Sequence, residues 1–117
     1  MSMLPWWFPF GDVPEIEAEE LGRRLRGPLP PQLLDVRTRS EWDKGHIARS
    51  LNVPIQELSS RISSLELDRA RPIVAICLSG HRSIAAVRLL SRRGYAEVQQ
   101  LGGGMLAWRR RRLPEDR

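Results

Sequence analysis

The stretch IVAICLSGHRSIAAVRLL, residues 73–90, decides the fold. It begins with a continuous β-branched apolar run that ends at Cys77, and such a run is typical of a strand covered on both faces. From Ser83 onward, apolar residues recur with helical spacing on one side of the chain: Ile84, Val87 and Leu90. The stretch therefore predicts a buried strand and an amphipathic helix, joined by a short loop that starts at a cysteine.

The same alternation continues on both sides of this stretch. Helices are expected at 17–25, at 55–65, from 83 to a C-cap at Gly94, and after the glycines at 102–104. Strands are expected at 33–36, 50–54, 71–77 and 96–101, and Thr38 with Glu41 forms a capping-box pattern. Strands that alternate with helices predict a parallel sheet with helices on both of its faces.

Length and composition indicate one domain. The 117 residues are 41% hydrophobic, which is enough for a single core, so residues 13–117 are expected to form the domain after an aromatic N-terminal arm at 1–12. One cysteine excludes an internal disulfide and favours a reducing compartment. Neither a run of roughly 20 apolar residues nor a signal-peptide pattern is visible, so we expect a cytoplasmic protein without a membrane partner. No metal or cofactor is expected.

The charge favours anionic partners. The formal net charge is +5, and all basic residues except Lys44 are arginine, a residue that binds anions well. The arginines at 109–112 form a basic cluster, but cations also suit the negative end of a helix dipole. Nucleic acid is an unlikely partner, because the chain has no repeat, no interleaved aromatic residues and no nucleic-acid-binding motif.

Cys77 has two readings. A lone cysteine after an apolar strand is often an inert, buried packing residue. Here, however, the loop at 78–82 curls round the sulfur and ends at a helix N-terminus, where backbone N–H groups and the dipole attract an anion. Gly80 allows a turn that other residues disfavour, and Arg82 and the Ser83 hydroxyl can add to the stabilisation of a thiolate. The hydroxyl of Ser83 can also serve simply as a helix cap.

Three blocks of the sequence resemble the rhodanese-like domain in order, content and spacing. They are LLDVRTRSEWDKGHIARSLNVP at 33–54, CLSGHRS at 77–83 and LGGGMLAW at 101–108. The resemblance implies a three-layer α/β/α sandwich with a five-stranded parallel sheet in the order 3-2-4-5-1. It also implies a cysteine that accepts a sulfane sulfur as a persulfide and passes it to a nucleophile.

The resemblance also assigns residues. Cys77 matches the nucleophile, and the loop that cradles the persulfide matches Leu78, Ser79, Gly80, His81 and Arg82. Asp35 is expected to pair with Arg82 and hold it in place, and Arg37 is expected to pair with Glu41. The glycines at 102–104 match a structural turn, and Trp42 and Trp108 fall at packing positions of the family.

Arg49 and Ser50 stand where the family commonly has Gly and Ala, so the turn there is expected to avoid a positive φ at 49. His46 is expected to form structural hydrogen bonds. The aromatic residues of the arm have no counterpart in the family and are expected to pack back on the domain, although docking a partner or touching a membrane surface are alternatives: Trp6, Trp7, Phe8 and Phe10.

These features predict a sulfurtransferase that takes sulfur from thiosulfate or a persulfide donor. Four residues separate Cys77 from Arg82, one fewer than in the related dual-specificity phosphatases, and the shorter loop suits sulfur better than phosphate. With no second cysteine, the acceptor must come from outside the chain, as a thiol, cyanide or a protein. The alternative is a persulfide carrier or regulatory module that serves a protein partner. An interaction domain without chemistry would not need Cys77.

Overall fold

The computed structural model describes residues 5–8 and 10–117. Strands and helices alternate along the chain. The strands are β1 (Glu15–Ile16), β2 (Gln32–Asp35), β3 (Leu51–Asn52), β4 (Ile73–Ile76) and β5 (Val98–Leu101). The helices are α1 (Ala18–Leu25), α2 (Arg39–Asp43), α3 (Ile55–Arg61) with the 3-10 turn η1 (Ile62–Ser64), α4 (His81–Arg92) and α5 (Gly104–Arg110).

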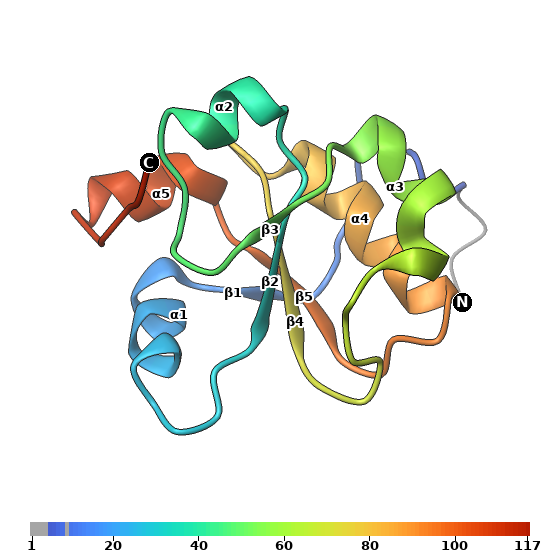
Figure 1. Ribbon diagram of the computed structural model, residues 1–117, viewed down its shortest axis with the longest axis horizontal. Helices are drawn as coiled ribbons and strands as arrows, with labels where there is room; N and C mark the ends of the chain where they lie inside the picture. The colour runs from blue at the N-terminus through green and yellow to red at the C-terminus, as the bar shows by residue number, and fades with distance from the viewer. Residues whose placement is uncertain (1–4, 9) are drawn as a thin grey trace.

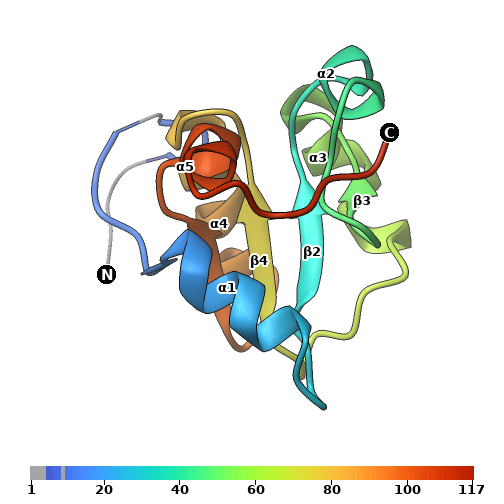
Figure 2. The same cartoon turned by 90° about the vertical axis from the view of Figure 1, so that its left-hand side faces the viewer.

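The five strands form one parallel sheet in the order β1-β5-β4-β2-β3. Read from the other edge, this is the expected order 3-2-4-5-1, so the predicted fold class is confirmed. Figure 1 shows the sheet between two helical layers, with α1 and α5 on one side and α3 and α4 on the other. Figure 2, turned by 90°, looks onto the side that carries α1 and α5, with α5 in front of α4.

Each face of the sheet has its own apolar core, because alternate residues of a strand point to opposite faces. Along β4, Ile73 and Ala75 belong to the core under α3 and α4, whereas Val74 and Ile76 belong to the core under α1 and α5. Burying a strand on both faces explains why residues 73–76 are apolar without interruption. Among the helices of the described residues, none is long and apolar enough to cross a bilayer.

Several predicted boundaries shift. The strand predicted at 50–54 shortens to Leu51–Asn52, and the long helix at 55–65 ends as an α-helix at Arg61. Helix α4 begins two residues early, at His81, and its C-cap is Arg93, with Gly94 following at φ 88°. The two-residue strand β1 pairs with β5 at one edge of the sheet.

The expectation for Arg49 is wrong. Its φ is 69°, in the left-handed region that glycine favours. The cause is a tight turn over residues 47–50, closed by a 3.1 Å hydrogen bond from Ser50 N–H to the Ile47 carbonyl. Turns of this length can require a positive φ at the third residue, which is the place of Arg49.

The described part of the arm packs against α4. Arg88, a largely buried residue of α4, donates to the carbonyl oxygens of Phe8 and Phe10, and Trp6 packs against the core under α3 and α4. Packing is therefore confirmed for Trp6. It is wrong as a general description of the arm, because the side chains of Trp7 and Phe10 are 61% and 60% exposed.

Candidate active site

Cys77 follows the carboxyl end of β4, where ligands of parallel sheets commonly bind. The residue is 1% exposed and belongs to the apolar core under α3 and α4. Its sulfur nevertheless faces polar groups: Gly80 N–H donates to Sγ at 2.9 Å, and the Ser83 hydroxyl lies 3.3 Å from Sγ. The sulfur therefore has the surroundings that suit an anion, which a purely packing cysteine does not need.

Gly80 shapes the loop that carries this amide. It is the N-cap of α4 and has a φ of 123°, a conformation that side-chain-bearing residues rarely adopt. A Cβ added there would come no closer than 4.0 Å to its nearest neighbour, Oε1 of Gln100, so conformation rather than space requires glycine. The predicted disfavoured turn at Gly80 is confirmed.

The first turn of α5 forms hydrogen bonds with the backbone of Cys77 and of Leu78, the first residue of the loop. Met105 N–H donates to the Cys77 carbonyl at 2.8 Å, and Leu106 N–H donates to the Leu78 carbonyl at 3.0 Å. A Cβ on Gly104, whose φ is 57°, would lie 2.4 Å from the Cys77 carbonyl oxygen. The glycines before α5 thus form the structural turn that was predicted, and they let a helix N-terminus touch the backbone of the candidate nucleophile.

The two ion pairs near the loop are exchanged relative to the prediction. Asp35 pairs with Arg37, with Nη2 and Nε of Arg37 at 2.8 and 3.0 Å from the carboxylate, and both side chains are buried. Arg82 instead places Nη1 and Nη2 at 2.6 and 2.9 Å from the two carboxylate oxygens of Glu41. The expected pairs of Asp35 with Arg82 and of Arg37 with Glu41 are therefore wrong.

The reason lies in local geometry. Arg37 is only two residues beyond Asp35, so its backbone N–H and its guanidinium both reach the Asp35 carboxylate. Glu41 is fixed beside Arg82 by the predicted capping box: Glu41 N–H donates to Thr38 Oγ1 at 3.2 Å, and Thr38 N–H donates to Glu41 Oε1 at 3.0 Å. The capping box is visible in the sequence, but the contact between Glu41 and Arg82 joins residues 41 positions apart and depends on the fold.

This pairing sets the electrostatics of the loop. The hydrogen bond from Arg82 lowers the pKa of Glu41 to about 2, although partial burial of Glu41 opposes the shift. The same hydrogen bond raises the pKa of Arg82, and the nearby Cys77 and Asp35 add smaller contributions in the same direction. Arg82 thus remains a cation at the end of the loop, oriented by a carboxylate that stays ionised.

A second network leads away from the sulfur through Ser83, which is fully buried. Its hydroxyl donates to Gln100 Oε1 at 2.6 Å, and Gln100 Nε2 donates to Glu15 Oε2 at 3.3 Å. A hydroxyl has one proton, so while Ser83 donates to Gln100 it can only accept from the thiol. Sequence reasoning missed Gln100, although a glutamine within a strand expected to be buried is an unusual residue.

The remaining loop side chains lie around this centre. Leu78 packs partly against the core under α1 and α5, whereas Ser79 and His81 are exposed. The His81 ring meets the Phe10 ring edge-on at 5.8 Å, which brings the arm to the loop.

The chain is similar to known proteins in sequence and in fold. The family model of the rhodanese-like domain matches residues 17–111. The chain belongs to the rhodanese-like domain family. A protein named sulfurtransferase from Allochromatium vinosum is 38% identical over 102 residues, which cover 87% of this chain and 94% of that protein.

Two other similar proteins differ in length: one is a longer regulator, and the other is a solved structure of about the size of this chain. The transcriptional regulator Rv0324 of Mycobacterium tuberculosis is 43% identical over 85% of this chain, which spans only 42% of that regulator. The crystal structure of a rhodanese-related protein from Thermoplasma volcanium has a TM-score of 0.79 and 33% identity, over 89% of this chain and 98% of that one. The relatives named as sulfurtransferases support sulfur transfer of the rhodanese kind.

Two further residues of the rhodanese-like blocks are structural, as expected. His46 stacks on Trp42 with ring centroids 3.6 Å apart, and its Nδ1 lies 2.7 Å from the Trp42 carbonyl oxygen. Trp108 is 1% exposed, and its indole N–H donates to the Pro114 carbonyl at 2.9 Å.

Proposed function

We propose that the protein is a sulfurtransferase in which Cys77 carries a sulfane sulfur as a persulfide. The observation that carries the proposal is the environment of Sγ, which accepts the Gly80 N–H at 2.9 Å in a loop that ends at the cation Arg82. Arg82 and the loop backbone of Leu78, Ser79, Gly80 and His81 attract an anionic donor. Ser83 contacts the sulfur at 3.3 Å, and Asp35 supports the site through Arg37.

The reaction consists of two displacements at sulfur. The Cys77 thiolate attacks the outer sulfur of thiosulfate, the bond between the two sulfur atoms of thiosulfate breaks, and its electron pair leaves with sulfite. A thiolate or cyanide then attacks the outer sulfur of the persulfide. The bond to Sγ breaks, its electron pair returns to Cys77, and the product is a new persulfide or thiocyanate.

The test is intact-mass measurement after incubation with thiosulfate, followed by cyanide and an assay for thiocyanate. We expect wild-type protein to gain the mass of one sulfur atom and to release it as thiocyanate. The Cys77→Ser variant should do neither. Arg82→Ala should form the persulfide about tenfold more slowly, because it removes a cation from the donor site, whereas the exposed control Arg39→Ala should behave as wild type. Absence of the added sulfur in wild-type protein with thiosulfate and with a small-molecule persulfide would refute the proposal.

The alternative function, a persulfide carrier or regulatory module for a protein partner, is favoured by one observation. Phe10 is 60% exposed and contacts His81 of the loop, so an apolar contact point lies beside the site. The same mass experiment separates the two functions. Fast release of thiocyanate indicates the enzyme, and a stable persulfide that leaves only to a protein thiol indicates the carrier.

A further inference from the structure

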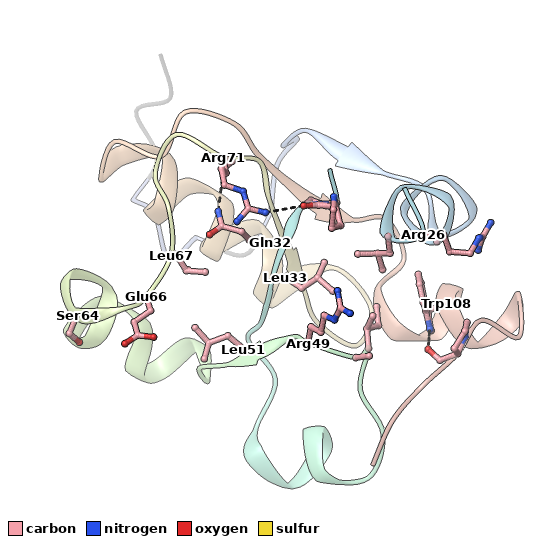
Figure 3. Close-up of a pocket in the computed structure, with 17 residues that line it drawn as sticks. Arg26, Gln32, Leu33, Arg49, Leu51, Ser64, Glu66, Leu67, Arg71 and Trp108 are labelled. Atoms are coloured by element: carbon pink, nitrogen blue, oxygen red, sulfur yellow. Dashed lines mark hydrogen bonds between the residues drawn. The ribbon is translucent and has the colours of Figure 1, made fainter. Parts of the chain in front are cut away.

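A cavity of about 860 Å³ lies at the end of the sheet where β2 and β3 begin, and residues of both apolar cores line it. It opens between α1, the segment before β2, the turn before β3 and the segment at 64–71 (Figure 3). Its apolar wall is formed chiefly by Leu25, Leu33, Ile47, Leu51, Leu67 and Trp108. The volume falls within the range of roughly 300–1,000 Å³ that is usual for small-molecule sites.

The cavity is separate from the candidate active site. Its lining includes Gln32, the first residue of β2, whereas Cys77 follows the last residue of the neighbouring strand β4. Since β2 and β4 are parallel, these two positions lie at opposite ends of the sheet. Among the described residues that line the cavity, none belongs to the loop at 78–82.

The charges at the cavity are mostly positive. Arg26, Arg49 and Arg71 line it, and Glu66 is the acidic residue among the lining residues. Arg71 already donates to the Pro30 carbonyl at 3.1 Å. Arg49 lies beside Leu33 in Figure 3, and within the described parts of the chain its guanidinium has no hydrogen-bond or ion-pair partner. A guanidinium beside an aliphatic wall is matched to a ligand that has both an anionic group and an apolar body.

The backbone supports a role for Arg49 itself. Of the described residues other than glycine, Arg49 and Arg112 are the two with positive φ, at 69° and 56°. This conformation is unfavourable for arginine by steric contact with its Cβ, and strain of this kind tends to persist where it serves a site. Glycine would fit the same turn without strain but would remove the Arg49 cation from the cavity wall.

We propose that this cavity binds a small amphiphilic anion, a carboxylate with an aliphatic tail. The carboxylate pairs with the Arg49 guanidinium, with Arg71 adding to the positive potential, and a guanidinium can hold a carboxylate through two parallel hydrogen bonds. The tail lies against the aliphatic wall of Leu25, Leu33 and Leu67. This inference does not depend on the chemistry of Cys77.

The test is calorimetric titration with decanoate, with 1-decanol and acetate as probes of the two halves of the ligand. We expect saturable binding of decanoate at one site, with a Kd on the order of 0.1 mM, and at least tenfold weaker binding of decanol and acetate. Arg49→Gly should weaken decanoate binding at least tenfold without lowering the melting temperature, because glycine removes the strain together with the cation. Arg49→Lys should keep part of the affinity.

The matched control is Arg112→Gly. Arg112 also has a positive φ, but it is exposed and lies outside the cavity lining. This variant should bind decanoate as wild type does. The proposal is overturned if wild type shows no saturable binding, if Arg49→Gly binds equally well, or if Arg112→Gly loses as much affinity as Arg49→Gly. The rate of Cys77 alkylation, measured in parallel, should be the same in all these variants. If wild-type protein took up no sulfur in the mass experiment, that result would refute the proposed function without bearing on the proposed decanoate site.

Discussion

Glu41 holds both terminal nitrogens of Arg82, at 2.6 and 2.9 Å, and thereby ties helix α2 to the first turn of α4 beside Cys77. The pair joins residues 41 positions apart in the sequence, on two elements that flank the candidate nucleophile. The position of the one cation at the end of the loop thus depends on a carboxylate that a helix cap fixes.

This pair predicts a specific pH dependence of stability. The pKa of Glu41 falls from 4.5 to about 2 on folding, so its stabilising contribution is complete above about pH 4.5 and is lost as the pH falls towards 2. Glu41→Gln should remove this contribution while keeping the capping box, in which Gln can replace Glu. Above pH 5 we expect a loss of roughly 1–2 kcal/mol in the free energy of unfolding, reduced by partial exposure.

The measurement is urea unfolding of both proteins between pH 2 and pH 6. The difference between wild type and Glu41→Gln should shrink as the pH falls. The control is Glu57→Gln, which removes an exposed pair with Arg61 and should change stability little. If the difference in the free energy of unfolding between wild type and Glu41→Gln stayed constant from pH 6 to pH 2, the result would contradict the lowered pKa of Glu41.

The buried pair of Asp35 and Arg37 predicts a structural effect. Asp35→Asn leaves the buried Arg37 without its counter-charge, and breaking such a pair costs about 3–5 kcal/mol in the free energy of unfolding. Asp43→Asn breaks the exposed pair with Arg39 and should cost less than about 1 kcal/mol. If Asp35→Asn instead retained wild-type stability and slowed only the reaction at Cys77, the role predicted from the sequence would return.

Gln100 predicts an effect on the reactivity of the thiol. While Ser83 donates to Gln100 Oε1, its proton is not available to a Cys77 thiolate. Gln100→Leu removes this acceptor, so the hydroxyl can turn to the sulfur or to the Gly80 carbonyl, each 3.3 Å away, and the anionic sulfur is the stronger acceptor. Alkylation of Cys77 by iodoacetamide at neutral pH should therefore be faster in Gln100→Leu than in wild type, by a factor of about two to ten.

The neighbouring Gln99 offers the control, because its side chain donates to the Glu15 carbonyl instead of contacting Ser83. Gln99→Leu should leave the alkylation profile unchanged. In a Ser83→Ala background, Gln100→Leu should have no further effect. If Gln100→Leu still changed the alkylation of Cys77 in the Ser83→Ala background, Gln100 would not act through Ser83.

Gly104 predicts a link between α5 and the loop. A Cβ at this position would lie 2.4 Å from the Cys77 carbonyl, so Gly104→Ala must displace either α5 or the loop. We expect a loss of about 2–4 kcal/mol in the free energy of unfolding and slower alkylation of Cys77. Gly94→Ala, at φ 88° with no atom within 4 Å of the added Cβ, should cost only about 1 kcal/mol and leave alkylation unchanged. Equal effects of the two substitutions would contradict a direct contact.

The sequence predicts most of the architecture, because long-range order follows from local pattern in a parallel α/β fold. The apolar run at 73–76, the helical spacing after Ser83 and the capping box at Thr38 all describe real elements. β1 escapes pattern analysis because its two residues become a strand only by pairing with β5, far along the chain.

The candidate site is less predictable from the sequence, because part of it is formed by contacts between segments far apart in the chain. The loop around Cys77 is continuous in sequence, so its glycine turn and helix start could be expected. The partners of Asp35 and Arg82 could not, since each depends on which side chain reaches across a few ångströms in three dimensions. Ser83 meets Gln100, and Gln100 meets Glu15, only because β5 lies between β4 and β1 in the sheet.

The hydrogen bonds from Met105 and Leu106 to the carbonyls of Cys77 and Leu78 also carry a consequence for biosynthesis. The ribosome makes the cysteine well before the helix that completes its frame. A nascent or truncated chain that ends before residue 105 carries Cys77 without these two hydrogen bonds, so the backbone of Cys77 and Leu78 is held in place only after α5 has been translated.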